Sequence, residues 1–191
     1  METERINYKI TFLSDWHAGS GLGSGADSDA VVIKDADNLP YLPGKTIKGL
    51  IKDSLLDIKE VQPEMVSKDF IDKYFGSEIK DEKEKVLKTI PGSLFFSNAA
   101  LPIAERNESM GAVSQFLYRN IASTAIDKTS GVAQQSSLRT MEVCIPIIIE
   151  GYIAGLDKDA LPTLEMGLKM LRHLGSNRNR GLGRCTIELK N

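Results

Sequence analysis

The sequence predicts an α+β fold, and two alternating segments and two amphipathic segments carry this prediction. "INYKITFL" near the start and "CTIELK" at the end alternate apolar and polar residues, which is the period of half-buried strands. Apolar residues recur at helical spacing after Pro43 and again over residues 159–175. Two further strand candidates lie between these helices, so the order is β-α-β-β-α-β, that of a ferredoxin-like (RRM-like) fold with long insertions.

The first and last strands, residues 6–12 and 185–190, each have one apolar side that faces the core. Their polar sides would line the open face of the sheet, since such folds carry both helices on the other face. The polar positions are Asn7, Lys9, Thr11, Thr186, Glu188 and Lys190. RNA-recognition domains stack bases on aromatic side chains at this face, and none of these six residues is aromatic. We therefore do not expect that mode of RNA binding.

The first helix begins near Pro43, because proline is well tolerated at a helix start. Its apolar face is formed by Ile47, Leu50, Ile51, Ser54, Leu55 and Ile58. Three lysines lie on the opposite side, at Lys45, Lys48 and Lys52. The spacing thus predicts an amphipathic helix with a basic outer face.

The chain is expected to form a single domain over residues 1–191, with insertions near 59–92 and 104–140. The first insertion contains "KDFIDKYFGS", a short helix that ends at Gly76, and then "EIKDEKEKVLK", whose mixed charges favour a mobile or solvated surface. "GSLFFSNAAL" follows as a strand. The second insertion lacks a sustained period and is interpreted as partly hairpin.

The third strand and the second helix complete the predicted core. "MEVCIPIIIEGYIAG" has strand character, with Pro146 indicating an edge or a bulge. "DALPTLEMGLKMLRHLG" is a helix with Pro162 near its start and Gly175 as its stop. Its buried residues are Leu164, Leu168, Leu171 and Leu174. A glycine-rich loop then leads into the last strand.

The composition is that of a globular protein, with 191 residues, 41% hydrophobic and 26% charged. No apolar run approaches the roughly 20 residues needed to cross a bilayer, and the first ten residues lack the features of a secretion leader. We therefore expect a cytoplasmic protein that has no membrane partner. Cys144 and Cys185 each lie inside an apolar alternation and are expected to be reduced core thiols.

Positive charge is concentrated at the end of the chain. The net charge is -2, yet residues 169–191 contain six basic residues and one acid, Glu188. A compact basic region on an acidic body favours contact with phosphates at one face, although a solvated basic tail has the same composition.

The segment "LPYLPGKTIKG" ends like a nucleotide-binding loop but lacks its other requirements. Leu39 replaces the first glycine, and Pro40 and Pro43 have no N–H to offer a phosphate. We expect no bound nucleotide. Lys45 and Lys48 remain as candidates for binding another phosphate at the helix start.

The segment "HAGSGLGSGADSD" offers one histidine and two aspartates in a glycine-rich loop. His17 could serve as a general base, or it could be a structural hydrogen-bonding residue, the commoner role of a lone histidine. The aspartates here and just beyond could gather a hard cation or simply form turns. They are Asp27, Asp29, Asp35 and Asp37.

The segment "HLGSNRNRGLGRC" is the most informative. Gly175, Gly181 and Gly183 permit close backbone approach, and three arginines supply forked cations suited to phosphate. These are Arg178, Arg180 and Arg184, and no acid lies among them. Phosphate binding is favoured over a turn that merely carries surface arginines.

Five stretches in order resemble the RAMP superfamily, the RNA-binding proteins of CRISPR systems, over residues 8–189. "HLGSNRNRGLGRC" resembles their glycine-rich loop, "LPYLPGKTIKG" the segment that opens their first helix, and "KYFGS" a turn. "LFFSNAAL" is similar to their second strand, and "AIDKTSGVAQQSSLRTMEV" to the segment before the third. The resemblance implies that Lys45, Lys48, Arg178, Arg180, Arg184, Gly181, Gly183 and His17 bind RNA.

Within the superfamily, "DSDAVVIKDADNLPYLPGKTIKG" most resembles the backbone subunit of type III CRISPR effector complexes. The resemblance implies self-association along a guide RNA, contact with other RAMP subunits, and cleavage of the paired target RNA. It places the catalytic aspartate at Asp29, with Asp27 as its neighbour, and implies a divalent cation, Mg²⁺ or Mn²⁺, at Asp29. Residues 126–138 would hold the tip of a thumb-like hairpin.

Two alternatives remain within this resemblance. One is a non-catalytic RAMP subunit that binds or caps guide RNA, with the aspartates acting only as turn formers. The other is a metal-independent endoribonuclease that processes guide RNA with His17.

Overall fold

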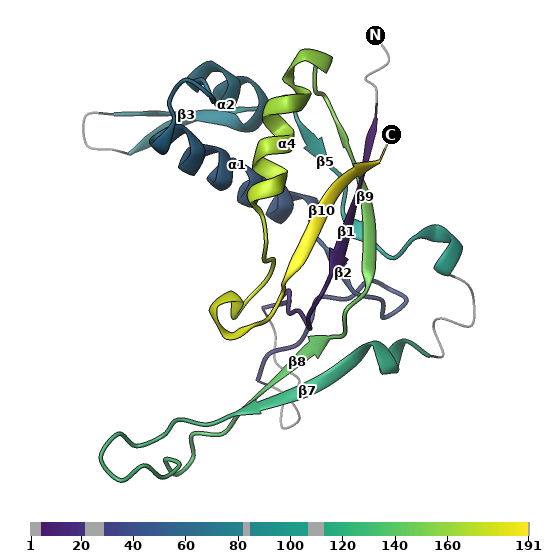
Figure 1. Ribbon diagram of the computed structural model, residues 1–191, viewed down its shortest axis with the longest axis vertical. Coiled ribbons are helices and arrows are strands. Elements are labelled where there is room, and N and C mark those ends of the chain that lie inside the picture. Colours follow the sequence, from purple (N-terminus) through teal and green to yellow (C-terminus); the bar gives the residue numbers. More distant parts are fainter. Residues whose placement is uncertain (1–4, 22–28, 82–84, 107–112, 191) are drawn as a thin grey trace.

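The centre of the fold is a six-stranded antiparallel sheet, seen in a computed structural model that describes residues 5–21, 29–81, 85–106 and 113–190 (Figure 1). The strand order is β10-β1-β9-β6-β2, and β5 also pairs with β9. The strands are β1 (Ile6–Phe12), β2 (Tyr41–Leu42), β5 (Phe95–Phe96), β6 (Ala99–Ala100), β9 (Ile148–Ala154) and β10 (Cys185–Lys190). The last strand, β10, thus lies beside the first, β1. On its other side β1 pairs with β9, the third strand of the predicted order, and this arrangement is consistent with a ferredoxin-like fold.

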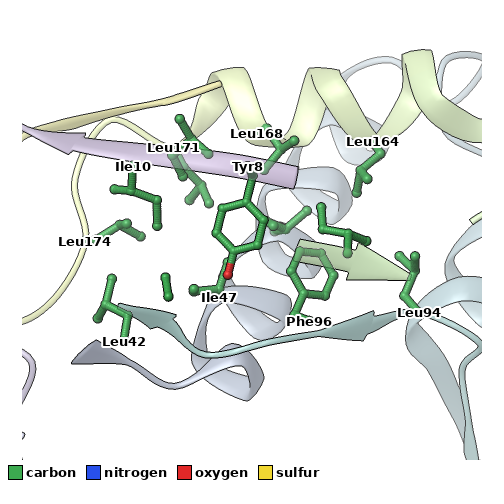
Figure 2. Close-up of a cluster of buried hydrophobic side chains, with 14 of the residues drawn as sticks. Tyr8, Ile10, Leu42, Ile47, Leu94, Phe96, Leu164, Leu168, Leu171 and Leu174 are labelled. Atoms are coloured by element: carbon green, nitrogen blue, oxygen red, sulfur yellow. The ribbon is translucent and has the colours of Figure 1, made fainter. Parts of the chain in front are cut away.

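Helices α1 (Gly44–Val61) and α4 (Leu161–Met170) contact each other and cover one face of this sheet (Figure 1). Ile47, Ile51 and Leu55 of α1 are fully buried, as their helical spacing predicts. Figure 2 shows Leu168 of α4 beside Tyr8 of β1 in the resulting core, with Leu164 further along the helix toward Leu94. The helices approach closely at Gly167, where a Cβ atom would lie 2.8 Å from the Leu55 side chain.

The second helix is shorter than its sequence predicts, because α4 ends at Met170 and not at Gly175. The residues after it are extended and pair with the segment before β10. The Leu174 N–H donates to the Gly183 carbonyl at 2.8 Å, and the Cys185 N–H donates to the Arg172 carbonyl at 2.9 Å. These bonds replace helical ones, while Leu171 and Leu174 stay buried.

Two of the predicted strands are interrupted. "GSLFFSNAAL" forms β5 and β6, with Ser97 and Asn98 between them. The predicted strand over residues 141–155 divides into β8 (Arg139–Cys144) and β9, with Pro146 in the gap. Proline cannot donate to a sheet, and here the chain changes partners, because β8 pairs with β7 (Tyr118–Ser123) and β9 with β1.

Each predicted insertion contains a hairpin. In the first, α2 (Lys68–Phe75) is capped by Ser67, and β3 (Gly76–Lys80) pairs with β4 (Val86–Pro91). The described part of the charged segment thus belongs to a hairpin, and the six exposed residues of β4 agree with the predicted solvated surface. In the second, β7 and β8 form a long hairpin that extends away from the sheet (Figure 1).

The remaining short elements are single turns of 3-10 helix. They are η1 (Ile103–Glu105), η2 (Ser114–Leu117), η3 (Lys158–Ala160) and η4 (Arg178–Arg180). Cys144 and Cys185 are free and buried, as predicted for core thiols.

Candidate nucleic-acid interface

The loop between α4 and β10 is held by hydrogen bonds to the residues that follow β1. The Ser176 N–H donates to the His17 carbonyl at 2.8 Å, and the Gly183 N–H donates to the Asp15 carbonyl at 2.7 Å. The Arg184 N–H donates to Ser14 Oγ at 3.0 Å. The glycine-rich loop is therefore an ordered part of the fold that presents its side chains from a fixed backbone.

Two of its glycines are required by close packing. Gly183 has φ +71°, and a Cβ atom there would lie 1.9 Å from the Leu174 carbonyl oxygen. Gly175 has φ +93°, and its Cβ atom would lie 2.4 Å from the His17 carbonyl oxygen. Gly181 also has a positive φ, +85°, but no atom would contact its Cβ within 4 Å. Gly175 and Gly183 thus pack closely against backbone atoms of other segments of the chain, whereas Gly181 supplies a left-handed turn.

Two arginines at the ends of this loop line an acid-free concavity, and two more lie in the turn before Gly181. Arg178 and Arg180 form the exposed turn η4, which leads into Gly181. Arg172 and Arg184 line a concavity of about 690 Å³ whose other lining residues are Leu13, Ser14, His173, Gly181, Cys185 and Thr186. Within the described parts of the chain, none of the four guanidinium groups forms an ion pair. Arg172 was not among the residues predicted for this site, because it falls inside a predicted helix.

The two candidate lysines at the start of α1 differ in their environments. Lys48 donates to the Leu94 carbonyl at 2.7 Å, and burial together with the nearby Lys52 lowers the pKa of its ammonium group. Lys45 is exposed, and both lysines line a second concavity, of about 660 Å³, beside β2 and β5. Since β10 and β2 lie at opposite ends of the sheet, the structure does not bring these lysines together with the arginines.

His17 lies inside the protein with 3% of its surface exposed. Its Nδ1 atom is 2.7 Å from the Glu142 carbonyl oxygen, and its own carbonyl holds the glycine-rich loop. This position fits the structural alternative for His17, since a buried ring can neither contact RNA nor reach its 2′-hydroxyl.

Asp29 is exposed at the base of the β7–β8 hairpin. Its N–H donates to the Thr140 carbonyl at 2.8 Å, and its Oδ2 accepts the Thr140 N–H at 2.8 Å. Asp27 lies outside the described residues.

Asp35 is a turn former. Its carboxylate accepts the N–H groups of Asp37 and Leu39, both at 3.0 Å, and pairs with Arg106. In the described ranges, no group of three or more histidine, cysteine or acidic side chains is placed to hold a metal ion.

A network that the sequence analysis did not anticipate fixes the base of the hairpin. Glu142 of β8 accepts the Val32 N–H at 2.9 Å and pairs with Lys34 at 2.8 Å. The Lys34 ammonium group lies 4.0 Å from the centre of the Tyr118 ring. These partners are far apart in sequence, so no local pattern could have indicated them.

An ion pair joins the hairpin to the glycine-rich loop through Asp15. Its carboxylate pairs with Arg119 of β7, while its carbonyl accepts the Gly183 N–H. The hairpin and the loop are therefore held against the same segment after β1.

No helix in the described part of the chain is long and apolar enough to cross a membrane. The model of the RAMP superfamily matches residues 9–186. The chain belongs to the RAMP superfamily.

Solved structures share the fold of this RAMP protein over 97% of its length. A chain in the cryo-EM structure of the type III-B Cmr-beta bound to cognate target RNA has a TM-score of 0.73 and 14% identity, and the match covers 97% of each chain. A chain in the apo state of Cmr-beta has a TM-score of 0.70 and 13% identity, over 97% of this chain and 96% of that one. No curated protein matches the sequence.

Proposed function

We propose that this RAMP protein is an RNA-binding subunit of a type III-B CRISPR effector complex, and that residues 172–184 bind the RNA backbone. The observation that carries this proposal is a group of four arginines that form no ion pair with any described residue, two of which, Arg172 and Arg184, line a concavity without acids. Guanidinium groups bind phosphates through two parallel N–H donors, and a fixed loop loses little entropy when it does so. Likeness to chains of Cmr-beta, one of them in a complex with target RNA, supports the assignment.

Within such a complex, we propose the backbone role, in which copies of the chain associate along a guide RNA and contact other RAMP subunits. The motif order of residues 27–49 supports this role. The match to a Cmr-beta chain covers 97% of each chain, and this supports a place for the protein as one subunit of such a complex.

Replacing both Arg178 and Arg180 by alanine tests the RNA surface. We expect the double variant to bind a single-stranded RNA roughly tenfold or more weakly, because each lost contact is a charge-assisted hydrogen bond. Fluorescence anisotropy of a labelled RNA measures this affinity. Lys85→Ala/Lys88→Ala, which removes two positive charges from the first hairpin, is the matched control and should bind normally. Equal affinities of both double variants would remove the loop from the RNA surface.

Cleavage of target RNA by Asp29 is a further part of the proposal. The exposed Asp29 carboxylate uses one oxygen for the Thr140 N–H, and the other can accept a proton. The RNA 2′-hydroxyl would give its proton to Asp29 and attack the adjacent phosphorus, and the departing 5′-oxygen would take a proton from water. The products are a 2′,3′-cyclic phosphate and a 5′-hydroxyl.

A resident Mg²⁺ or Mn²⁺ does not fit the described residues at this position. Among the described residues, no group of three or more acidic, histidine or cysteine side chains includes Asp29, and one carboxylate with a backbone partner is too small a ligand set for a hard cation. The proton transfer to Asp29 described above needs no metal ion. This donor set also favours the second candidate function, a subunit that binds RNA without cutting it. The burial of His17 gives no support to guide processing by that residue.

The variant Asp29→Asn separates these two functions. In a reconstituted complex with guide and target RNA, we expect it to abolish target cleavage while assembly and RNA binding remain, because the amide cannot accept the proton. Gel analysis of labelled target RNA in Mg²⁺ and Mn²⁺ measures the products. Asp37→Asn, an exposed aspartate of the same segment, is the control. A wild-type complex that yields no products in either cation would establish the non-catalytic function.

A further inference from the structure

We propose that the concavity lined by Tyr41, Lys45, Phe95 and Asn98 binds one unpaired nucleotide of the RNA, with its base stacked on Phe95 and its phosphate at Lys45. The concavity has a volume of about 660 Å³, and none of its lining residues is acidic. The inference rests on the proposed RNA-binding function and adds a second contact site, at the opposite end of the sheet from the arginines.

Phe95 is an exposed aromatic ring on a rigid support. Its side chain is 54% exposed, although β5 is hydrogen-bonded into the central sheet. Just after it, the Ser97 N–H donates to the Tyr152 carbonyl at 2.9 Å, and the Tyr152 N–H donates to Ser97 Oγ at 2.8 Å. A ring held in this way can receive a base with little loss of conformational entropy.

A row of side chains supports Phe95 along the open face of the sheet. The Tyr152 ring lies 5.8 Å from the Phe95 ring, tilted by 44°, and Arg5 lies 4.7 Å from the centre of the Tyr152 ring. The first and last strands carry no aromatic residue on this face, as the sequence analysis noted, but β5 and β9 supply two. Stacking of a base is therefore available here after all.

The polar groups beside the ring suit the rest of a nucleotide. Lys45 is exposed, and none of its described neighbours forms an ion pair with it. Asn98 Oδ1 accepts the Gly44 N–H at 3.0 Å, which fixes the amide and leaves its NH₂ group to donate to a base edge or a ribose oxygen. A cation, a stacking surface and a donor together match a nucleotide better than a peptide.

Phe95→Ala tests the site in the full-length protein with a single-stranded RNA that carries one 2-aminopurine. We expect a loss of affinity of roughly 5- to 100-fold and a loss of the fluorescence quenching that stacking causes. Phe95→Trp should retain both, because it keeps a stacking surface. Phe116→Ala removes a phenylalanine that is 70% exposed elsewhere in the chain, and should change neither. Thermal unfolding of each variant checks that the fold is kept.

Three results would overturn this inference while the arginine loop still binds RNA. They are unchanged affinity and quenching in Phe95→Ala, equal losses in Phe95→Ala and Phe116→Ala, and loss of protein assembly without loss of RNA binding. Competition by AMP at micromolar concentration would likewise exclude RNA as the source of the nucleotide. If the wild-type protein binds no RNA at all, the proposed function itself fails.

Discussion

At the scale of single residues, position within the fold separates side chains that look equivalent in sequence. Lys45 and Lys48 are both predicted to contact phosphate and both line the same concavity, yet the Lys48 ammonium group is bonded to the Leu94 carbonyl, whereas Lys45 is exposed. His17 is a candidate general base by sequence, but its side chain lies in the interior. The residue types could be predicted, but their partners come from distant segments.

The two cysteines give a prediction at this scale. Burial, with a smaller effect of Asp15 on Cys144, raises the pKa of each thiol to about 12 from its ordinary value near 9. At pH 8 both thiols are thus protonated in the folded protein, and roughly 1000-fold less thiolate is available than in the unfolded chain. Because the pKa is higher in the folded state, the stability contributed by the protonated thiols is fully present below pH 9. It is lost as the pH rises toward 12.

Iodoacetamide labelling followed by mass spectrometry measures this protection. We expect little labelling of the native protein at pH 8 and rapid labelling of both cysteines in concentrated urea. The single variants Cys144→Ala and Cys185→Ala assign each signal. Equal rates in native and unfolded protein would contradict the burial of the thiols.

At the scale of elements, the glycine-rich loop is shaped by its backbone contacts and not by glycine content alone. We expect Gly183→Ala to reduce the free energy of unfolding by about 3 kcal/mol or more, since the new Cβ would overlap the Leu174 carbonyl in addition to the left-handed strain. Gly181→Ala is the matched control and should cost only about 1 to 2 kcal/mol, because its Cβ meets open space. Urea unfolding measures both, and equal costs would show that Gly183 is not packed as described.

The elements also show where periodicity is sufficient as evidence and where it is not. The first strand and first helix could be predicted closely, because their apolar residues repeat over a long stretch and one face is buried. The end of α4 could not, since it is decided by bonds that join Leu174 to Gly183 and Arg172 to Cys185, which are outside the helix. The charged hairpin β3–β4 was not predicted, because all six residues of β4 are exposed. A strand without a buried face need not alternate apolar and polar residues.

At the scale of the whole molecule, the sheet separates two basic sites. The arginine loop lies beside β10, the Lys45 concavity beside β2, and the long hairpin is joined to the same segment after β1 as the loop. The first site could be predicted from the sequence, since Arg178, Arg180 and Arg184 lie close together in the chain. It does not indicate that Phe95 and Tyr152 meet, because 56 intervening residues separate them.

The salt dependence of RNA affinity tests the central claim, that the loop arginines neutralise RNA phosphates, most directly. Each phosphate contact with single-stranded RNA contributes a slope of about -0.7 to the plot of log affinity against log salt concentration. Arg178→Ala/Arg180→Ala should therefore give a plot shallower by about 1.4 than the wild type, while Lys85→Ala/Lys88→Ala should leave the slope unchanged. Identical slopes for all three proteins would contradict the claim.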